Sequence, residues 1–306
     1  MKIPHPIPYQ GSKRWLAHTI CQCLPRNVPT FYEPFAGSAA VTLAAAAGGL
    51  AGRFALSDIH PPLMSLWNAI VNAPEELAAE YECLWTAQTG RGRDYYDEVR
   101  SQFNRGKEPA PFLYLLARCV KAAIRYNTKG EFNNSPDNRR LGAKPRTMRW
   151  HIHESSRLLR VVTDISCRDF RDATAPATAD DVIFMDPPYQ GVSRERDARY
   201  VSGLGYADFC DALAEMNRRG LSYIVSYDGR TGERRYGEPL PKELELLHFE
   251  VAAGRSTQET LLGRDSTTYE SVYLSQALIA RIGRAPASLS NPRIPDEQLS
   301  LFEGAA

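Results

Sequence analysis

A short segment, Asp186-Pro187-Pro188-Tyr189, carries the side chains of this 306-residue chain best suited to chemistry. It directly follows the apolar run 182–185, which predicts a buried parallel strand that ends at Asp186. Ligands of open α/β sheets bind just beyond the carboxyl ends of such strands. The alternative, a Pro-Pro turn capped by tyrosine, does not account for the strand in front. Asp186 and the Pro187 carbonyl could accept both hydrogens of an exocyclic amino group while Tyr189 stacks on its planar ring.

Two segments nearer the N-terminus have the pattern of a nucleotide-cofactor site. Residues 30–35 predict a strand, residues 36–40 a tight turn of small side chains, and residues 41–47 a helix. Such a loop alone is weak evidence, but Asp58 ends a second strand (53–57) about twenty residues later, where an acid can bind both ribose hydroxyls. The alternative role for Asp58 is an N-cap for a helix at 61–64. Ahead of both segments, Gly11 and Ser12 predict a turn before a helix through residues 16–20.

The composition is that of an ordinary globular protein, with 43% apolar residues, 24% charged residues and a formal net charge of +1. An anionic partner must therefore be bound by a local patch. The six cysteines show no repeated C-x-x-C spacing, which favours a reducing compartment, and no apolar run is long enough for a membrane span. We therefore expect a cytoplasmic protein without membrane contact. His151, His153 and Glu154 are expected on a helix surface, and we expect no metal site.

Such a patch is predicted in the segment 74–150, where the strand–helix alternation is replaced by helices at 75–88, 95–104 and 112–126. Residues 118–150 carry nine basic and two acidic side chains, with aromatic and asparagine residues between them. This combination is typical of a nucleic-acid surface, although a solvated basic loop is the simpler alternative. The candidate DNA contacts are Arg118, Lys121, Arg125, Tyr126, Asn127, Lys129, Asn133, Arg139 and Arg140.

The second half returns to the parallel pattern. We expect a strand at 164–170 that ends in an acid and an aromatic residue, a helix at 206–219, and a central strand at 221–227 ended by Asp228-Gly229. Residues 192–205 are expected to form a loop over the site, and residues 243–251 and 271–278 an antiparallel hairpin at the sheet edge. The fold class is therefore α/β. We expect a catalytic domain in two parts (1–73 and 151–280), a helical recognition insertion (74–150) and a flexible tail (281–306).

Five motifs in this order resemble the Dam-type DNA adenine-N6 methyltransferases. They are Tyr9-Gln10-Gly11-Ser12-Lys13, Glu33-Pro34-Phe35-Ala36-Gly37-Ser38-Ala39, Leu56-Ser57-Asp58-Ile59, the segment from Arg125 to Asn133, and Asp186-Pro187-Pro188-Tyr189. The resemblance implies a Rossmann-like class I methyltransferase sheet, S-adenosyl-L-methionine as methyl donor, and a flipped adenine in double-stranded DNA as acceptor.

Carried onto this chain, the resemblance implies a cofactor pocket formed by Tyr9, Lys13, Phe35, Gly37, Asp58, Asp169, Phe170 and Asp186. Asp186, Pro187, Pro188 and Tyr189 would hold the target base. Two positions depart from the family pattern: Tyr9 stands where the family often has tryptophan, and Ala39 replaces the second glycine of its motif. The methyl group of Ala39 is incompatible with the loop only if its φ is positive.

Three other functions fit parts of the pattern. An N4-cytosine methyltransferase also acts on an amino group, but aspartate rather than serine at position 186 favours adenine. An RNA adenine methyltransferase could use the same four residues, and a DNA-binding module could keep the fold without catalysis. The sequence does not decide between an orphan methylase and a restriction-modification partner, or between a bacterial and a phage origin.

The tail carries a further motif. Residues 286–295 are rich in Pro, Ser and Asn and predict a flexible linker. Gln298, Leu299, Ser300, Leu301 and Phe302 follow, and they resemble the short peptide by which bacterial replication and repair proteins dock on the sliding clamp. The alternative is that the two leucines and the phenylalanine fold back onto the domain.

Overall fold

A computed structural model describes residues 2–160, 162–188, 204–231, 234–235, 237–255 and 267–283. Its centre is one sheet with the strand order β3-β2-β1-β4-β5-β8-β7, with β6 paired to β5 outside this order. The strands are β1 (Val28–Glu33), β2 (Ala51–Asp58), β3 (Thr163–Cys167), β4 (Val182–Met185), β5 (Tyr223–Thr231), β6 (Arg234–Arg235), β7 (Leu247–Arg255) and β8 (Thr267–Leu274).

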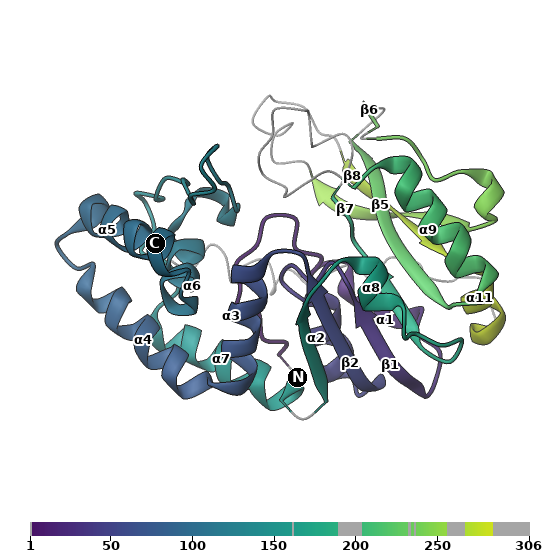
Figure 1. The fold of residues 1–306 in the computed structure, drawn as a ribbon, viewed down its shortest axis with the longest axis horizontal. Helices are drawn as coiled ribbons and strands as arrows, with labels where there is room; N and C mark the ends of the chain where they lie inside the picture. The colour runs from purple at the N-terminus through teal and green to yellow at the C-terminus, as the bar shows by residue number, and fades with distance from the viewer. Residues whose placement is uncertain are drawn as a thin grey trace.

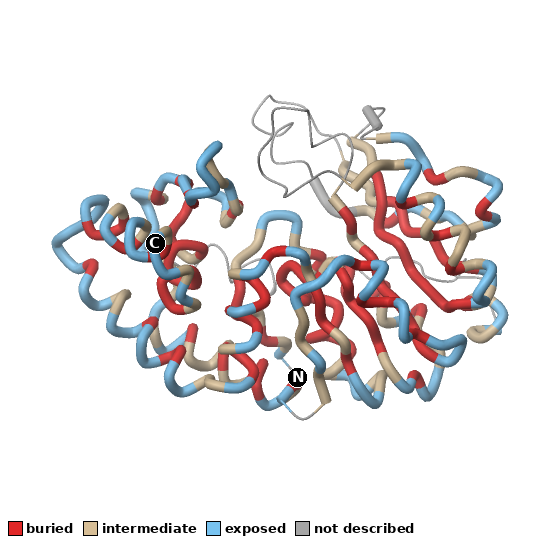
Figure 2. The backbone as a smooth tube through the Cα atoms, viewed as in Figure 1, coloured by how far each residue is buried: buried red, intermediate tan, exposed pale blue. Residues whose placement is uncertain are grey.

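Strands β3, β2, β1, β4 and β5 are parallel, whereas β8 and β7 are antiparallel to their neighbours. All four residues of β4 are buried, and buried residues run along the central strands of the sheet (Figure 2). Val182 and Phe184 belong to the larger hydrophobic cluster, and Ile183 and Met185 to a second cluster that includes Phe209 of α9. The predicted α/β fold and its antiparallel edge hairpin are therefore confirmed.

The helices are α1 (Ala17–Gln22), α2 (Ala40–Ala47), α3 (Pro61–Asn72), α4 (Pro74–Ala87), α5 (Gly92–Gly106), α6 (Pro109–Arg118), α7 (Pro145–Leu159), α8 (Phe170–Thr174), α9 (Tyr206–Arg218) and α11 (Gln276–Ile282). Helices α4, α5 and α6 gather at one end of the molecule, and β5, β7 and β8 lie at the other (Figure 1). Tyr81 of α4 and Phe112 of α6 share one hydrophobic cluster with Trp67 of α3 and Phe31 of β1. Helix α7 crosses residue 150, so the expected end of the insertion lies inside a helix.

Two predicted elements end earlier than expected. The helix predicted at 112–126 stops at Arg118, because Cys119 is extended and both Lys121 and Ala122 have positive φ. The strand predicted at 164–170 stops at Cys167. Asp169 instead caps α8, its carboxylate accepting a hydrogen bond from Arg171 N at 2.9 Å. Both errors arise where a local backbone or capping preference interrupts an otherwise continuous pattern.

The C-terminal strands differ from the prediction in another way. Strand β5 continues through Asp228 and Gly229 by a bulge, in which Asp228 adopts φ 55°. A Cβ on Gly229 would lie 2.7 Å from the Tyr269 carbonyl oxygen, so the bulge requires glycine there. Residues 276–278, expected in a strand, begin α11, because the Ser275 hydroxyl caps that helix.

Some expectations concern residues that the structure does not describe: Tyr189, the segment 192–203, and the tail with residues 298–302. Among the helices that are described, none is long and apolar enough to cross a membrane. Within the same residues, no group of three or more His, Cys, Asp or Glu side chains could hold a metal ion, and His151 and His153 lie on α7.

Candidate active site

A cavity of about 310 Å³ lies where β1, β2 and β4 end, which is within the range that small ligands occupy. All eight residues predicted to bind the cofactor line it, namely Tyr9, Lys13, Phe35, Gly37, Asp58, Asp169, Phe170 and Asp186. Pro187 and Pro188 also line it, whereas the predicted catalytic Tyr189 lies outside the described residues. The topology thus brings residues from four separate motifs to one site.

The loop after β1 is fixed in place by contacts of Gly37 with Tyr9, Asp58 and Trp67. Gly37 has φ 46°, and a Cβ there would lie 3.2 Å from the Tyr9 ring. Its backbone N–H donates to an Asp58 carboxylate oxygen at 3.3 Å, and its carbonyl accepts from the Trp67 indole at 2.9 Å. Glycine avoids both the strain of a positive φ and a close contact with the Tyr9 ring, and the hydrogen bonds fix the loop.

Ala39 also has a positive φ, of 46°, which is the condition under which its methyl group was expected to disturb the loop. A left-handed alanine costs about 1–2 kcal/mol relative to the right-handed conformation. The methyl group is nevertheless fully buried and does not line the cavity, whereas the neighbouring Ser38 and Ala40 do. Alanine in place of the motif glycine therefore strains the backbone without narrowing the cavity.

Asp58 faces the cavity and is not a helix cap. His60 caps α3 instead, since its Nδ1 accepts a hydrogen bond from Leu63 N at 3.1 Å. Asp58 accepts hydrogen bonds from Gly37 N and, at 3.0 Å, from His60 N. Burial raises the pKa of Asp58, and these backbone hydrogen bonds oppose the shift. A carboxylate has about four acceptor positions, so Asp58 can still bind two ribose hydroxyls.

Tyr126 was predicted to contact DNA, and in the structure it is half-buried at the cavity. It lines the cavity, and its hydroxyl lies 2.6 Å from His60 Nε2. Because His60 Nδ1 is an acceptor, Nε2 carries the proton and donates to Tyr126. Burial lowers the pKa of His60 to about 4, which keeps this neutral tautomer at neutral pH. Tyr126 therefore belongs to the cavity wall, and its contact with DNA stays a prediction.

The charged groups lie at the β4 end of the cavity. Lys13, only 5% exposed, places its Nζ 3.2 Å from Asp186 Oδ1 and 3.1 Å from Glu270 Oε2. The buried Glu33 accepts a hydrogen bond from Thr42 N at 2.8 Å. Burial, reinforced by the charge of Asp186, raises the pKa of Glu33 to about 8 against the opposing Thr42 hydrogen bond. Glu33 is therefore mostly protonated at neutral pH.

Aromatic rings close another part of the cavity wall. The rings of Phe35 and Phe170 are stacked, with centroids 5.2 Å apart. Arg171 lies over the Phe170 ring at 4.9 Å, and Phe209 contacts the same ring at a tilt. Since Phe170 is only 2% exposed, its neighbours already cover most of it, and it supports Phe35 in the cavity wall.

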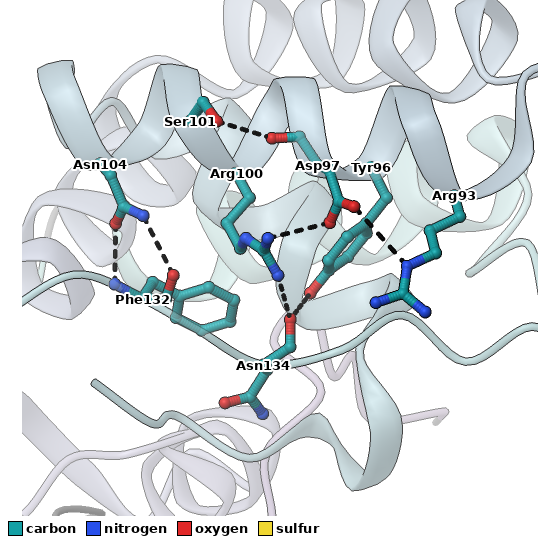
Figure 3. A network of polar contacts seen from close by, with 8 residues as sticks. All are labelled: Arg93, Tyr96, Asp97, Arg100, Ser101, Asn104, Phe132 and Asn134. Carbon is teal, nitrogen blue, oxygen red and sulfur yellow. Dashed lines mark hydrogen bonds and ion pairs between the residues drawn. The ribbon is translucent and has the colours of Figure 1, made fainter. Parts of the chain in front are cut away.

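Beside the cavity, residues 125–133 form a hairpin through the antiparallel bridge between Tyr126 and Phe132. The Asn127 side chain closes its turn by accepting from the backbone N–H groups of Lys129 and Glu131, each at 2.9 Å. Asn104 of α5 holds the far strand by donating to the Phe132 carbonyl and accepting from its N–H (Figure 3). The hairpin is thus fixed to the helical insertion.

The same helix also holds Asn134, just beyond the hairpin. Tyr96 and Arg100 both donate to the carbonyl of Asn134, at 3.0 and 3.3 Å (Figure 3). The Arg100 guanidinium is itself held by Asp97 at 3.0 Å. Residues 128–131 and 133 of the hairpin remain exposed.

Most of the predicted DNA contacts are on the surface. Lys121, Arg125, Lys129, Asn133, Arg139 and Arg140 are exposed. Arg118 is an exception, because it is 3% exposed and donates to the Asp137 carbonyl at 2.7 Å. Its expected DNA contact is therefore replaced by a structural role in holding the loop after α6. Asn127 is half-buried and is used within its own turn.

Three residues of the site carry no assigned role in the sequence analysis. Glu33 belongs to the motif before the glycine loop, but its burial could not be inferred from the motif. His60 lies two residues after Asp58, yet only the tertiary contact with Tyr126 shows its role. Glu270 has no sequence signal, because it comes from a strand far along the chain and reaches the site through Lys13.

Comparison with known proteins agrees with this geometry. The sequence model of D12 class N6 adenine-specific DNA methyltransferases matches residues 9–248. The chain is 29% identical to the DNA adenine methylase of Haemophilus influenzae over 194 residues. The aligned region covers 62% of this chain and 65% of that protein. The chain is 27% identical over 239 residues to the DNA adenine methylase of Vibrio cholerae, covering 75% and 83% of the two chains. Because the family model spans most of the chain, the protein belongs to the D12 class N6 adenine-specific DNA methyltransferase family.

Proposed function

We propose that the protein transfers a methyl group from S-adenosyl-L-methionine to N6 of an adenine that is flipped out of double-stranded DNA. The observation that carries this proposal is the position of Asp186 at the end of β4, in the wall of the same cavity as Asp58 and the Gly37 loop. An acceptor for an amino group and a site for a nucleoside cofactor therefore share one space. The substrate is DNA, so we also propose that the enzyme works in the cytoplasm of a bacterium, of host or phage origin.

The described residues fit the cofactor. Asp58 keeps acceptor positions for the two ribose hydroxyls, and the Gly37 loop gives backbone access beside it. Asp186 lines the cavity, where its negative charge suits a cationic ligand. When bound, the cofactor supplies an electrophilic methyl group on a sulfonium.

The role of the chain is to make the adenine amine a better nucleophile and to position it. The amine lone pair is delocalised into the ring, and hydrogen bonds from its two N–H groups to Asp186 and the Pro187 carbonyl favour a pyramidal nitrogen. The nitrogen can then form a bond to the methyl carbon as the carbon–sulfur bond breaks, and the methylated amine afterwards releases one proton to water. This catalysis needs orientation and fixed electrostatics and no covalent enzyme intermediate.

Nucleoside analysis tests the proposal directly. Duplex DNA and structured RNA are incubated in separate reactions with the protein and tritiated S-adenosyl-L-methionine, and DNA binding is measured alongside. The nucleic acids are digested and their nucleosides are separated. We expect the label in N6-methyl-2′-deoxyadenosine. Label in N4-methylcytosine, or label in structured RNA but not in duplex DNA, would contradict the proposal in favour of a different acceptor. No label in any acceptor, with DNA binding retained, would favour a non-catalytic module.

We also propose that residues 298–302 dock on a bacterial sliding clamp, which would raise the local concentration of the enzyme on replicating DNA. The support is the Gln298 to Phe302 pattern alone. A clamp titrated with the intact chain and with a chain ending at Asp296 tests it: binding lost only in the shorter chain is expected, and equal binding or none would contradict it.

A further inference from the structure

Glu270 lies beside the active site without lining it. It belongs to β8, an antiparallel strand that pairs with β5, whereas Asp186 follows β4 on the other side of β5. Its Oε2 atom is 3.1 Å from Lys13 Nζ and accepts a hydrogen bond from the Ser226 hydroxyl at 3.3 Å. The carboxylate is therefore oriented both by the turn that carries Lys13 and by strand β5.

Lys13 connects Glu270 to the reacting group. Its ammonium lies between Asp186 and Glu270, and its side chain is 6% exposed, against 22% and 17% for the two acids. A lysine side chain has four rotatable carbon bonds, and contact with two carboxylates restricts it more than contact with one. Glu270 thus fixes the position of the Lys13 ammonium, which in turn fixes the Asp186 carboxylate.

The charges of these three residues give a second reason for the arrangement. With Asp186 as its only partner, the ammonium would draw electron density from the carboxylate that must accept the amine hydrogens. Glu270 shares the ammonium and leaves the three residues with one more negative than positive charge. Positive charge develops on the amine nitrogen during methyl transfer, so this excess stabilises the transition state.

We propose that Glu270 is a positioning residue for methyl transfer, which acts through Lys13 to keep Asp186 in place and fully available as an acceptor. The inference rests on the proposed function. Strand β8, which lies outside the recognised motifs, would thus contribute through Glu270 to the rate of methyl transfer.

The test is a Glu270→Gln variant, which keeps the size and an acceptor oxygen but removes the charge. Single-turnover methyl transfer is measured at saturating cofactor and DNA, together with both dissociation constants and the melting temperature. We expect the rate to fall on the order of 10- to 100-fold, as for supporting residues of other sites, with both dissociation constants within about threefold. The matched control is Glu250→Gln on the neighbouring β7, where the carboxylate pairs with Arg230 at 2.7 Å outside the cavity. Its rate should equal that of the wild type.

A Glu270→Gln rate within about twofold of the wild type would overturn the inference, since changes below this size are not resolved from experimental variation. So would a slow rate accompanied by weakened cofactor binding or a lowered melting temperature, because these indicate a structural role. Should Glu270→Gln not fold, Ser226→Ala decides: a slower rate with unchanged binding supports the inference, and an unchanged rate overturns it. A wild-type protein without methyl transfer would overturn the proposed function itself, whereas an active wild type beside an equally active Glu270→Gln overturns only this inference.

Discussion

Asp58 offers a quantitative test of the cofactor site. Gly37 N and His60 N each use one acceptor position of its carboxylate, at 3.3 and 3.0 Å, which leaves about two positions for the ribose hydroxyls. A hydrogen bond to a charged group contributes about 1.5–3 kcal/mol. We use the lower value because water would replace part of the lost interaction in Asp58→Ala. Two bonds then give about 3 kcal/mol, or a dissociation constant raised about 150-fold.

The assay is calorimetric titration of the wild type and Asp58→Ala with S-adenosyl-L-methionine. The rate at saturating cofactor should stay within severalfold of the wild type, since Asp58 is not expected to touch the reacting atoms. Asp164→Ala is the matched control, because Asp164 is an exposed acid on the neighbouring β3 outside the cavity. An affinity within threefold of the wild type for Asp58→Ala, or an equal loss in the control, would refute the assignment.

Three further changes test other parts of the site. Burial raises the pKa of Glu33 from 4.5 to about 8, so the unfolded chain loses this proton first and the stability of the wild type declines as pH rises from about 4.5 to 8. The melting temperature of Glu33→Gln relative to the wild type should therefore rise between pH 5 and 8. A constant difference in melting temperature would contradict the burial effect. Tyr126→Phe should weaken cofactor and DNA binding alike by about fivefold, for one lost hydrogen bond, and an effect confined to DNA would restore its original assignment. Lys129→Ala should weaken binding to all duplexes and reduce the slope of log affinity against log salt concentration by about one, because Lys129 is exposed. Arg118→Ala should chiefly lower the melting temperature, because Arg118 is buried. The reverse pattern would contradict the roles assigned to the two residues.

The parallel sheet could be predicted because its signals are local. The four apolar residues before Asp186 can be buried only between two layers, and the structure has all four buried. The glycine loop and Asp58 belong to one strand–turn–helix–strand unit, so their meeting at the cavity was also predictable. Periodicity failed where the backbone departs from regular geometry, as at the end of α6 and at the Asp228 bulge in β5.

The contacts between distant segments could not be predicted. Lys13 and Glu270 are separated by most of the chain, and only the order of the strands brings them together. The exposure of a basic residue is equally a tertiary property. Arg118 and Lys129 belong to the same basic segment, yet one is buried under the loop after α6 and the other is exposed in the hairpin turn.

The central claim is that Asp186 acts on the amino group and not on DNA binding or folding. The most direct measurement is single-turnover methyl transfer by Asp186→Ala, with duplex affinity determined on the same preparation. We expect the rate to fall by at least about 1000-fold, since a main acceptor for the reacting amine is lost, while DNA affinity stays within a few fold. Methyl transfer at a rate near that of the wild type would contradict the claim.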